Sequence, residues 1–168
     1  MTLIHSTERS FTVNDFADKV LEIISLTQVD ISYISLEMTE SILMNSIEKG
    51  SSMINKLRKA GISISLDDFG TGYSSLKYFK ELPISILKID KSFIDNIETN
   101  EYDEQLVDTM IQLAHNKKIQ VIAEGVESNI QLDRLRNLGC DLVQGYLFSK
   151  AIDRDAMFQL ALQTDIMK

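Results

Sequence analysis

The sequence predicts an α/β fold built around a parallel β-sheet. Short runs rich in β-branched residues alternate with longer amphipathic runs, a pattern typical of strands joined by crossover helices. The runs Ile62–Leu66 and Ile84–Ile89 are too apolar for a sheet with one wet face, so we expect burial on both faces. The chain has one proline and no Gly/Ser-rich linker, which indicates a single domain over residues 1–168.

Each expected element follows from this alternation. The expected strands are Thr2–His5, Ile31–Glu37, Ile62–Asp67, Ile84–Ile89, Ile119–Ala123 and Leu142–Leu147. The expected helices are Val13–Leu26, Ser46–Lys59, Ser75–Lys80, Glu101–Asn116, Ser128–Asn137 and Arg154–Gln163. In the first helix, the spacing of Phe16, Val20, Ile23 and Ile24 predicts one buried face. A doubly wound sheet and a barrel both satisfy this order, and a complete eight-stranded barrel takes about 250 residues.

Composition excludes several classes of protein. Seventeen basic against 25 acidic residues give a net charge of −8, which argues against a DNA, RNA or anionic-membrane surface. A single cysteine, Cys140, excludes a disulfide framework and a multi-thiolate zinc site. No apolar run approaches the roughly 18 residues of a membrane-spanning segment, and no signal peptide is recognisable. A cytoplasmic setting is therefore expected.

Polar residues stand at the carboxyl ends of five successive expected strands. In strand order they are Glu37, Asp67 with Asp68, Lys88 with Asp90, Glu124, and Gln144. The carboxyl ends of parallel strands meet at one rim of an α/β fold, where ligand and catalytic sites form. We therefore expect these side chains to share one site.

The carboxylates of this set predict a divalent metal site. Glu37, Asp67, Asp68 and Glu124 would repel one another in a partly desolvated pocket, and Mg²⁺ or Mn²⁺ is the natural counter-ion for oxygen ligands. Asp67 and Asp68 reach one site only if the backbone turns, which the glycines after Phe69 permit. A carboxylate that bridges two metals suits hydrolysis of a phosphate ester, with a lysine orienting the attacking water.

Five motifs together resemble the EAL family of bacterial phosphodiesterases, which act in second-messenger signalling. The motifs are Glu37-Met-Thr-Glu40-Ser41, Asp67-Asp68-Phe-Gly-Thr-Gly-Tyr-Ser-Ser-Leu76, Leu87-Lys88-Ile-Asp90, Ala123-Glu124-Gly-Val-Glu127 and Gln144-Gly-Tyr-Leu-Phe-Ser149. They occur in the family's order over essentially the whole chain. The resemblance implies a TIM-like (β/α) barrel and metal-dependent hydrolysis of cyclic di-GMP to pGpG.

The resemblance also implies roles for individual residues. The implied metal ligands are Glu37, Asp67, Asp68 and Glu124, with Asp67 as the bridging ligand. Lys88 and Glu124 are implied at the catalytic centre, and Gln144 and Asp90 are implied to line the substrate site. Glu40 resembles the glutamate that anchors the Asp-Asp-Phe-Gly-Thr-Gly loop, which in the family also contributes to a dimer interface.

Two departures from the family pattern affect the expected activity. The Glu-Ala-Leu signature and the first strands are absent, so we expect an incomplete barrel that is truncated at its N-terminal side. His5 stands where the family has a metal-binding asparagine, either as an altered ligand or as a frayed terminal residue. Both departures compromise the first metal site of a two-metal centre. We expect weak or no hydrolysis by these 168 residues alone.

Alternative functions remain open from the sequence. The chain could be a degenerate, non-catalytic EAL module that binds cyclic di-GMP or a protein partner. Another metal-dependent barrel enzyme, such as an enolase-type proton abstractor, would also use a lysine and carboxylates, but it does not explain the Asp-Asp-Phe-Gly-Thr-Gly loop. An incomplete barrel leaves unpaired strand edges, so we also expect a homodimer or a strand-exchanged oligomer.

Overall fold

The sheet of the molecule is parallel and six-stranded, with neighbouring strands in chain order. The computed structural model describes residues 2–5, 16–40, 47–70 and 76–163. The strands are β1 (Thr2–His5), β2 (Ile34–Thr39), β3 (Ser63–Phe69), β4 (Ile86–Ile89), β5 (Gln120–Ala123) and β6 (Leu142–Val143). Every neighbouring pair is parallel, as the alternation of elements predicts.

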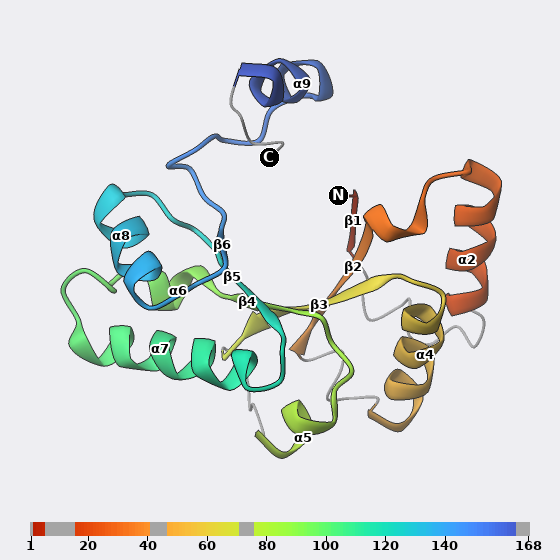
Figure 1. Cartoon of the computed structure of the whole chain (residues 1–168), viewed down its shortest axis with the longest axis horizontal. Coiled ribbons are helices and arrows are strands. Elements are labelled where there is room, and N and C mark those ends of the chain that lie inside the picture. Colours follow the sequence, from red (N-terminus) through yellow and green to blue (C-terminus); the bar gives the residue numbers. More distant parts are fainter. Residues whose placement is uncertain (1, 6–15, 41–46, 71–75, 164–168) are drawn as a thin grey trace.

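The order of the strands distinguishes the barrel from the doubly wound sheet. A doubly wound sheet reverses its strand order at a switch point and carries helices on both faces. Here the order runs from β1 to β6 without reversal, and most helices cover the outer side of a curved sheet (Figure 1). The chain therefore forms part of a TIM-like barrel, in which β1 and β6 are the two edges among the described residues.

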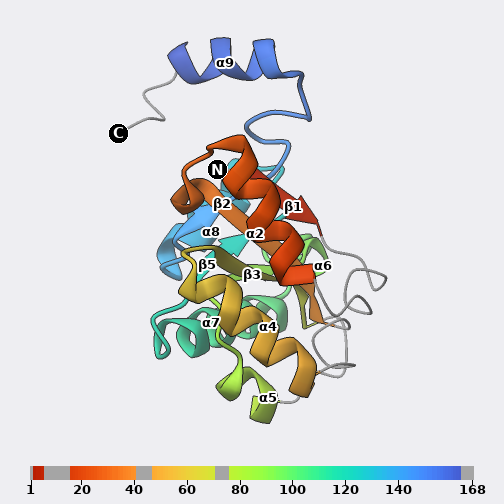
Figure 2. The same ribbon diagram turned by 90° about the vertical axis from the view of Figure 1, so that its right-hand side faces the viewer.

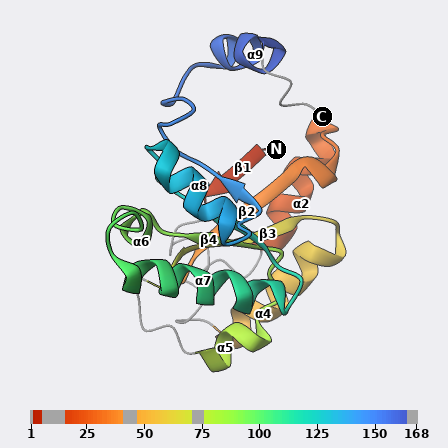
Figure 3. The same ribbon diagram turned by 60° about the vertical axis from the view of Figure 1, so that its left-hand side comes forward.

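The helices follow the predicted alternation. They are α2 (Phe16–Thr27), α4 (Ile47–Lys59), α5 (Leu76–Glu81), α6 (Lys91–Ile94), α7 (Glu101–His115), α8 (Asn129–Asn137) and α9 (Arg154–Gln163), with a 3₁₀ turn, η1, at Ile31–Tyr33. Helix α9 stands apart from the rest of the domain in all three ribbon views (Figures 1, 2 and 3). None of the helices in the described ranges has the length and apolar character that crossing a bilayer requires.

Several expected boundaries were wrong. The strand expected from Ile31 begins at Ile34, because the Asp30 side chain accepts from the backbone N–H of Ser32 and caps η1. The last strand is only Leu142–Val143, and the chain beyond it follows an irregular path. Ile23, expected on the buried face of the first helix, is 61% exposed. Helix α6 was missed, because four residues are too few to show helical periodicity.

The two faces of the sheet differ in composition. Successive residues of a strand point to opposite faces. One face packs against the helices and forms the hydrophobic core, which includes Leu36, Met38, Ile64, Leu66, Leu87, Ile89, Val121 and Ala123. The alternate positions face the inside of the curved sheet and include Ser35, Glu37, Ser65, Asp67 and Lys88. This polar inner face leads to the carboxyl ends of the strands.

Candidate active site

Lys88 of β4 lies at the centre of a cluster of carboxylates. Its Nζ is 2.6 Å from Glu124, 2.7 Å from Glu37 and 3.2 Å from Asp67. Only 5% of the lysine side chain is exposed, so these contacts form largely out of water. Side chains from β2, β3, β4 and the end of β5 thus meet at one point, where the sequence places the shared site.

Asp67 and Asp68 reach the same site through an irregularity in β3. The register with β4 shifts between Leu66 and Phe69, and Asp68 has a left-handed backbone with φ of 56°. The turn expected after Phe69 therefore begins earlier, at Asp68 itself. As a result, oxygen atoms of Asp67, Asp68 and Glu124 all lie within 4.8 Å of one another. Carboxylate oxygens at this spacing fit a hard divalent cation such as Mg²⁺ or Mn²⁺.

The electrostatics of the cluster indicate an excess of negative charge. Burial raises the pKa of Glu124, and Asp67 and Glu37 add to the shift, whereas its hydrogen bond with Lys88 opposes it. Burial likewise raises the pKa of Asp68, reinforced by the charge of Asp67. Burial alone would lower the pKa of Lys88, but its hydrogen bonds to Glu124 and Glu37 more than offset this and raise it. Lys88 therefore stays protonated, and the surrounding carboxylates favour additional positive charge.

Glu40 connects the end of β2 to the turn after β3. Its Oε2 accepts a hydrogen bond from the backbone N–H of Gly70 at 3.3 Å. Gly70 has φ of 96°, and a Cβ there would lie 2.9 Å from Met110 and Phe93, so only glycine fits without displacing them. This contact is the one expected of a loop anchor. Ser41 and residues 71–75 of the adjoining motifs lie outside the described residues.

The two expected substrate-site residues, Asp90 and Gln144, have other contacts. Asp90 accepts hydrogen bonds from the N–H and hydroxyl of Ser92, which cap α6 and hold the pKa of Asp90 below its ordinary value. Gln144 is exposed, and its backbone bonds to Ala123 and Val126. A Cβ on Gly145 would lie 2.0 Å from the carbonyl oxygen of Val126, so this glycine permits the close approach.

A second ion-pair group, absent from the sequence prediction, supports the loop after β5. Lys91 Nζ lies 2.6 Å from Glu127 and 3.0 Å from Asp95. Its aliphatic stem passes over Gly125, where a Cβ would lie 2.4 Å from the lysine Cγ. Gly125, directly after Glu124, was the feature of the sequence that could have indicated this close packing. Its φ of 72° is a conformation that favours glycine.

The register of the first strand places His5 opposite Glu37. The backbone of His5 therefore lies at the carboxyl end of β1, beside the acidic cluster, while its side chain lies outside what the structure describes. Glu37 itself is not one of the three carboxylates within 4.8 Å, and Lys88 connects it to them.

The fold and the cluster define an α/β barrel with an acidic site at the carboxyl ends of its strands. Comparison with known families places the chain within this class. The EAL domain matches residues 2–151, and the chain belongs to the EAL family. The family and the fold predicted from the motifs are thereby confirmed.

Curated relatives cover most of the chain. Signaling protein YkoW of Bacillus subtilis is 39% identical over 160 residues, which are 95% of this chain and 20% of YkoW. Cyclic di-GMP phosphodiesterase NbdA of Pseudomonas aeruginosa is 44% identical over 125 residues, or 74% of this chain and 16% of NbdA. The chain therefore spans about a fifth or less of the length of these relatives.

Solved structures of EAL proteins share the fold. EAL enzyme Bd1971, in a form with cAMP and cyclic di-GMP bound, superposes with a TM-score of 0.91 at 39% identity. The match covers 95% of this chain and 42% of Bd1971. BlrP1 of Klebsiella pneumoniae, in a complex with manganese and cyclic di-GMP, gives a TM-score of 0.82 at 25% identity over 88% of this chain and 38% of BlrP1. Structures of the family thus hold divalent metal together with the dinucleotide.

Proposed function

We propose that residues 1–168 are the larger part of a metal-dependent EAL phosphodiesterase domain that hydrolyses cyclic di-GMP to pGpG, with weak or no activity in this chain alone. The observation that carries the proposal is the convergence of Glu37, Asp67 and Glu124 on Lys88. Relatives and solved structures named as cyclic di-GMP phosphodiesterases and complexes support the substrate.

Asp67, Asp68 and Glu124 are the residues that would hold a divalent metal. Their oxygens lie close together, and the cluster has more negative than positive charge. The phosphate of a cyclic dinucleotide is itself an anion, so it approaches such a cluster only when cations are present. Bound Mg²⁺ or Mn²⁺ supplies Lewis acidity toward the phosphate and lowers the pKa of water. Of the two expected metal sites, the first, which would use Glu37 and the residue at position 5, binds its metal more weakly.

Lys88 and Glu124 act on the water and the phosphate. The protonated Lys88 only donates hydrogen bonds, so it orients a water through the water's oxygen atom and attracts the phosphate. Glu124, whose carboxylate lies 2.6 Å from the Lys88 ammonium group, is placed to accept the water's proton. The water oxygen bonds to phosphorus as one ester P–O bond breaks, the leaving ribose oxygen takes up a proton from solvent, and the linear product pGpG leaves. Gln144 and Asp90 keep the substrate-site role that the family motifs imply for them.

A second candidate is a non-catalytic module that binds cyclic di-GMP without cleaving it. The observation in its favour is the strand register, which places His5 opposite Glu37. The family has a metal-binding asparagine at the position of His5. Imidazole suits Mg²⁺ poorly, which weakens a two-metal centre at this end of β1.

Turnover in two forms of the protein tests the proposal. One form is the 168-residue chain, and the other is a chimera that adds the segment preceding the matched region of YkoW. With Mn²⁺ or Mg²⁺, we expect the chimera to produce pGpG and the chain alone to produce little or none. Lys88→Ala in the chimera should lower the rate by about 10²-fold or more. The matched control is Lys56→Ala, because Lys56 of α4 forms an exposed ion pair with Asp18 of α2 and not with a carboxylate of the cluster.

The outcomes separate the two candidates. A Lys88→Ala chimera as active as its parent would remove the role given to Lys88. Calorimetry that shows cyclic di-GMP binding to the chimera in Mn²⁺ with no pGpG formed would favour the non-catalytic module. Turnover by the 168-residue chain itself would exclude that module.

A further inference from the structure

We infer that Lys117, in the turn between α7 and β5, is a positioning residue for the Asp67–Asp68 pair and acts through the aromatic side chains of α5 and β3. The inference rests on the proposed function, because it takes the aspartate pair to be a metal site. Lys117 belongs to none of the motifs that identify the family.

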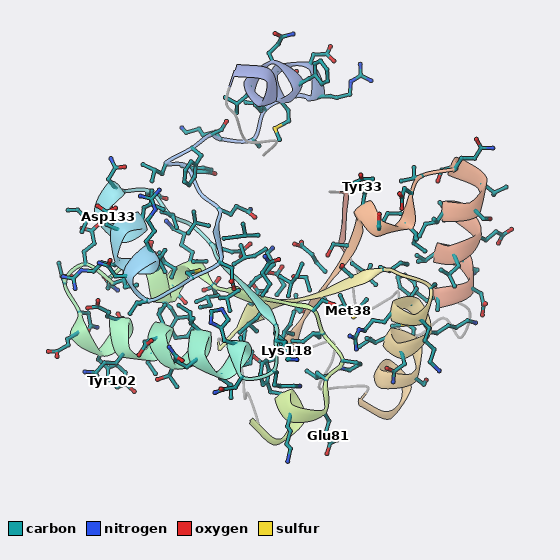
Figure 4. The ribbon with its side chains drawn as sticks, viewed as in Figure 1. Tyr33, Met38, Glu81, Tyr102, Lys118 and Asp133 are labelled. Carbon is teal, nitrogen blue, oxygen red and sulfur yellow. The ribbon has the colours of Figure 1, made fainter. Side chains whose placement is uncertain are left out.

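Lys117 binds the carboxyl end of α5 at three points. Its Nζ donates to the carbonyl oxygens of Phe79 at 2.8 Å, Lys80 at 2.9 Å and Leu82 at 3.3 Å. The same ammonium group lies 5.2 Å from the centroid of the Phe79 ring. An ammonium group has three N–H donors, so these contacts use its full hydrogen-bonding capacity. Figure 1 shows the α7–β5 turn close to α5, and Figure 4 labels Lys118 in this turn.

The backbone that carries Lys117 is itself fixed. Its N–H donates to the carbonyl oxygen of Ala114, and the next two N–H groups donate to His115 and Ala114. The side chain therefore extends from a turn that is hydrogen-bonded at three successive positions. The ammonium group is partly buried where it binds the Phe79 carbonyl oxygen, and this burial lowers the pKa of Lys117, with nearby Arg58 adding to the shift.

Helix α5 needs an external contact of this kind. It spans only Leu76–Glu81, and so short a helix is not stable in water without tertiary contacts. A cation at the carboxyl end binds carbonyl groups that lack partners within the helix and interacts favourably with the helix dipole. Lys117 supplies this cation from a position 37 residues further along the chain from Lys80.

Phe79 transmits the position of α5 to the aspartate pair. Its ring is 3% exposed and packs on Phe69, with centroids 5.3 Å apart and planes inclined by 45°. Phe69 is the last residue of β3 and directly follows Asp68, whose left-handed backbone directs both carboxylates to one site. A movement of α5 would shift the Phe79 ring, then Phe69, and with it the oxygens of Asp67 and Asp68.

The test is the affinity of the 168-residue chain for Mn²⁺ alone, measured by electron paramagnetic resonance at 20 °C on the folded protein. We expect Lys117→Met to weaken Mn²⁺ binding by about 10-fold, the lower end of the loss seen when a direct partner of a metal ligand is removed, because Lys117 acts through the Phe79 and Phe69 rings. Lys117→Arg retains a cation and several donors, so it should restore most of the affinity. The matched control is Lys19→Met on the exposed side of α2, which should leave binding unchanged.

Each result decides a separate question. Asp68→Asn tests the proposed metal site, and a wild-type chain that binds no Mn²⁺ overturns both that site and the role of Lys117. Wild-type binding with equal affinity in Lys117→Met overturns the role of Lys117 alone. A purely structural lysine would lower the melting temperature and leave the affinity at 20 °C unchanged. If Lys117→Met does not fold, Phe79→Leu replaces it, and unchanged affinity in that variant overturns the inference.

Discussion

At the scale of single residues, two serine hydroxyl groups on the inner face of the sheet are buried at a cost in stability. Ser35 and Ser65 are at most 1% exposed, and their Oγ atoms have no hydrogen-bond partner in the part of the chain that the structure describes. Ser65 pairs in register with Glu37, directly beneath the acidic cluster. A buried hydroxyl without a partner loses the free energy of hydration that it has in the unfolded chain.

Ser65→Ala should therefore raise the free energy of unfolding by about 1 kcal/mol, since it removes an unsatisfied polar atom and little volume. Urea denaturation at pH 7 measures the change. A loss of stability of similar size would instead mean that the Ser65 hydroxyl is hydrogen-bonded in solution.

Lys118 is a second residue with a local cost. It has φ of 59°, a conformation that glycine adopts freely and that other residues adopt with strain. Lys118→Gly should stabilise the protein by up to about 1 kcal/mol, because the relief of strain exceeds the added backbone entropy of the unfolded chain. The control is Gln112→Gly inside α7, one turn before its C-terminal end, where a replacement by glycine should cost about 1 kcal/mol in thermal or urea denaturation. Equal effects at both sites would contradict the strain at Lys118.

At the scale of elements, Asp141 joins α7, β5 and β6. Its Oδ2 lies 2.8 Å from His115 Nε2 and accepts from the Val121 N–H at 2.7 Å. Burial raises the pKa of Asp141, but the hydrogen bonds from His115 and Val121 outweigh it, so the net shift is downward. A lowered pKa in the folded state means that this carboxylate stabilises the fold above its unfolded pKa of about 3.9 and loses that effect as pH falls through the folded value.

Asp141→Asn should therefore lower the free energy of unfolding by about 1 kcal/mol at pH 7, with the side chain's partial exposure keeping the effect small. The difference from the wild type should shrink below about pH 4 as the wild-type carboxylate becomes protonated. Urea denaturation from pH 7 to pH 2.5 measures this, with Asp133→Asn on the exposed side of α8 as the control. A difference that is constant with pH would contradict the ionised contact.

At the scale of the whole molecule, β1 and β6 each have one strand neighbour among the residues that the structure describes, and apolar side chains near both edges are exposed. Tyr33 lies near the β1 edge (Figure 4), and Tyr146 and Phe148 follow β6, each more than half exposed. Unpaired edges and apolar patches of this kind favour association.

We therefore expect the isolated chain to form a homodimer or a strand-exchanged oligomer. Size-exclusion chromatography with light scattering should give at least twice the chain mass of 19.1 kDa. A thermally stable monomer of 19.1 kDa would contradict this expectation.

Features that depend on short segments of the sequence were predicted correctly, whereas features that depend on tertiary contacts were not. The parallel sheet, the apolar strands such as Ile62–Leu66 and the family motifs were all predictable, because periodicity and motif spacing are properties of short segments. The exposure of Ile23 was not predictable, because its spacing fits the apolar face of the helix although its side chain points away from the core. Helix α6 was missed and the last strand was expected to be longer than Leu142–Val143 for a related reason, since capping by Asp90 and strand pairing set the lengths of these elements.

The sequence by itself determined which residues stand at the carboxyl ends of the strands, and that their charges repel one another unless a cation is bound or some carboxylates stay protonated. The tertiary structure decided the strand order, the left-handed turn at Asp68, the three carboxylates around Lys88 and the contact of Lys117 with α5. These features depend on the register between strands and on contacts between segments far apart in the chain. The local sequence identifies the chemical groups available at each strand end. The distances between these groups are set only when the strands pair into the sheet.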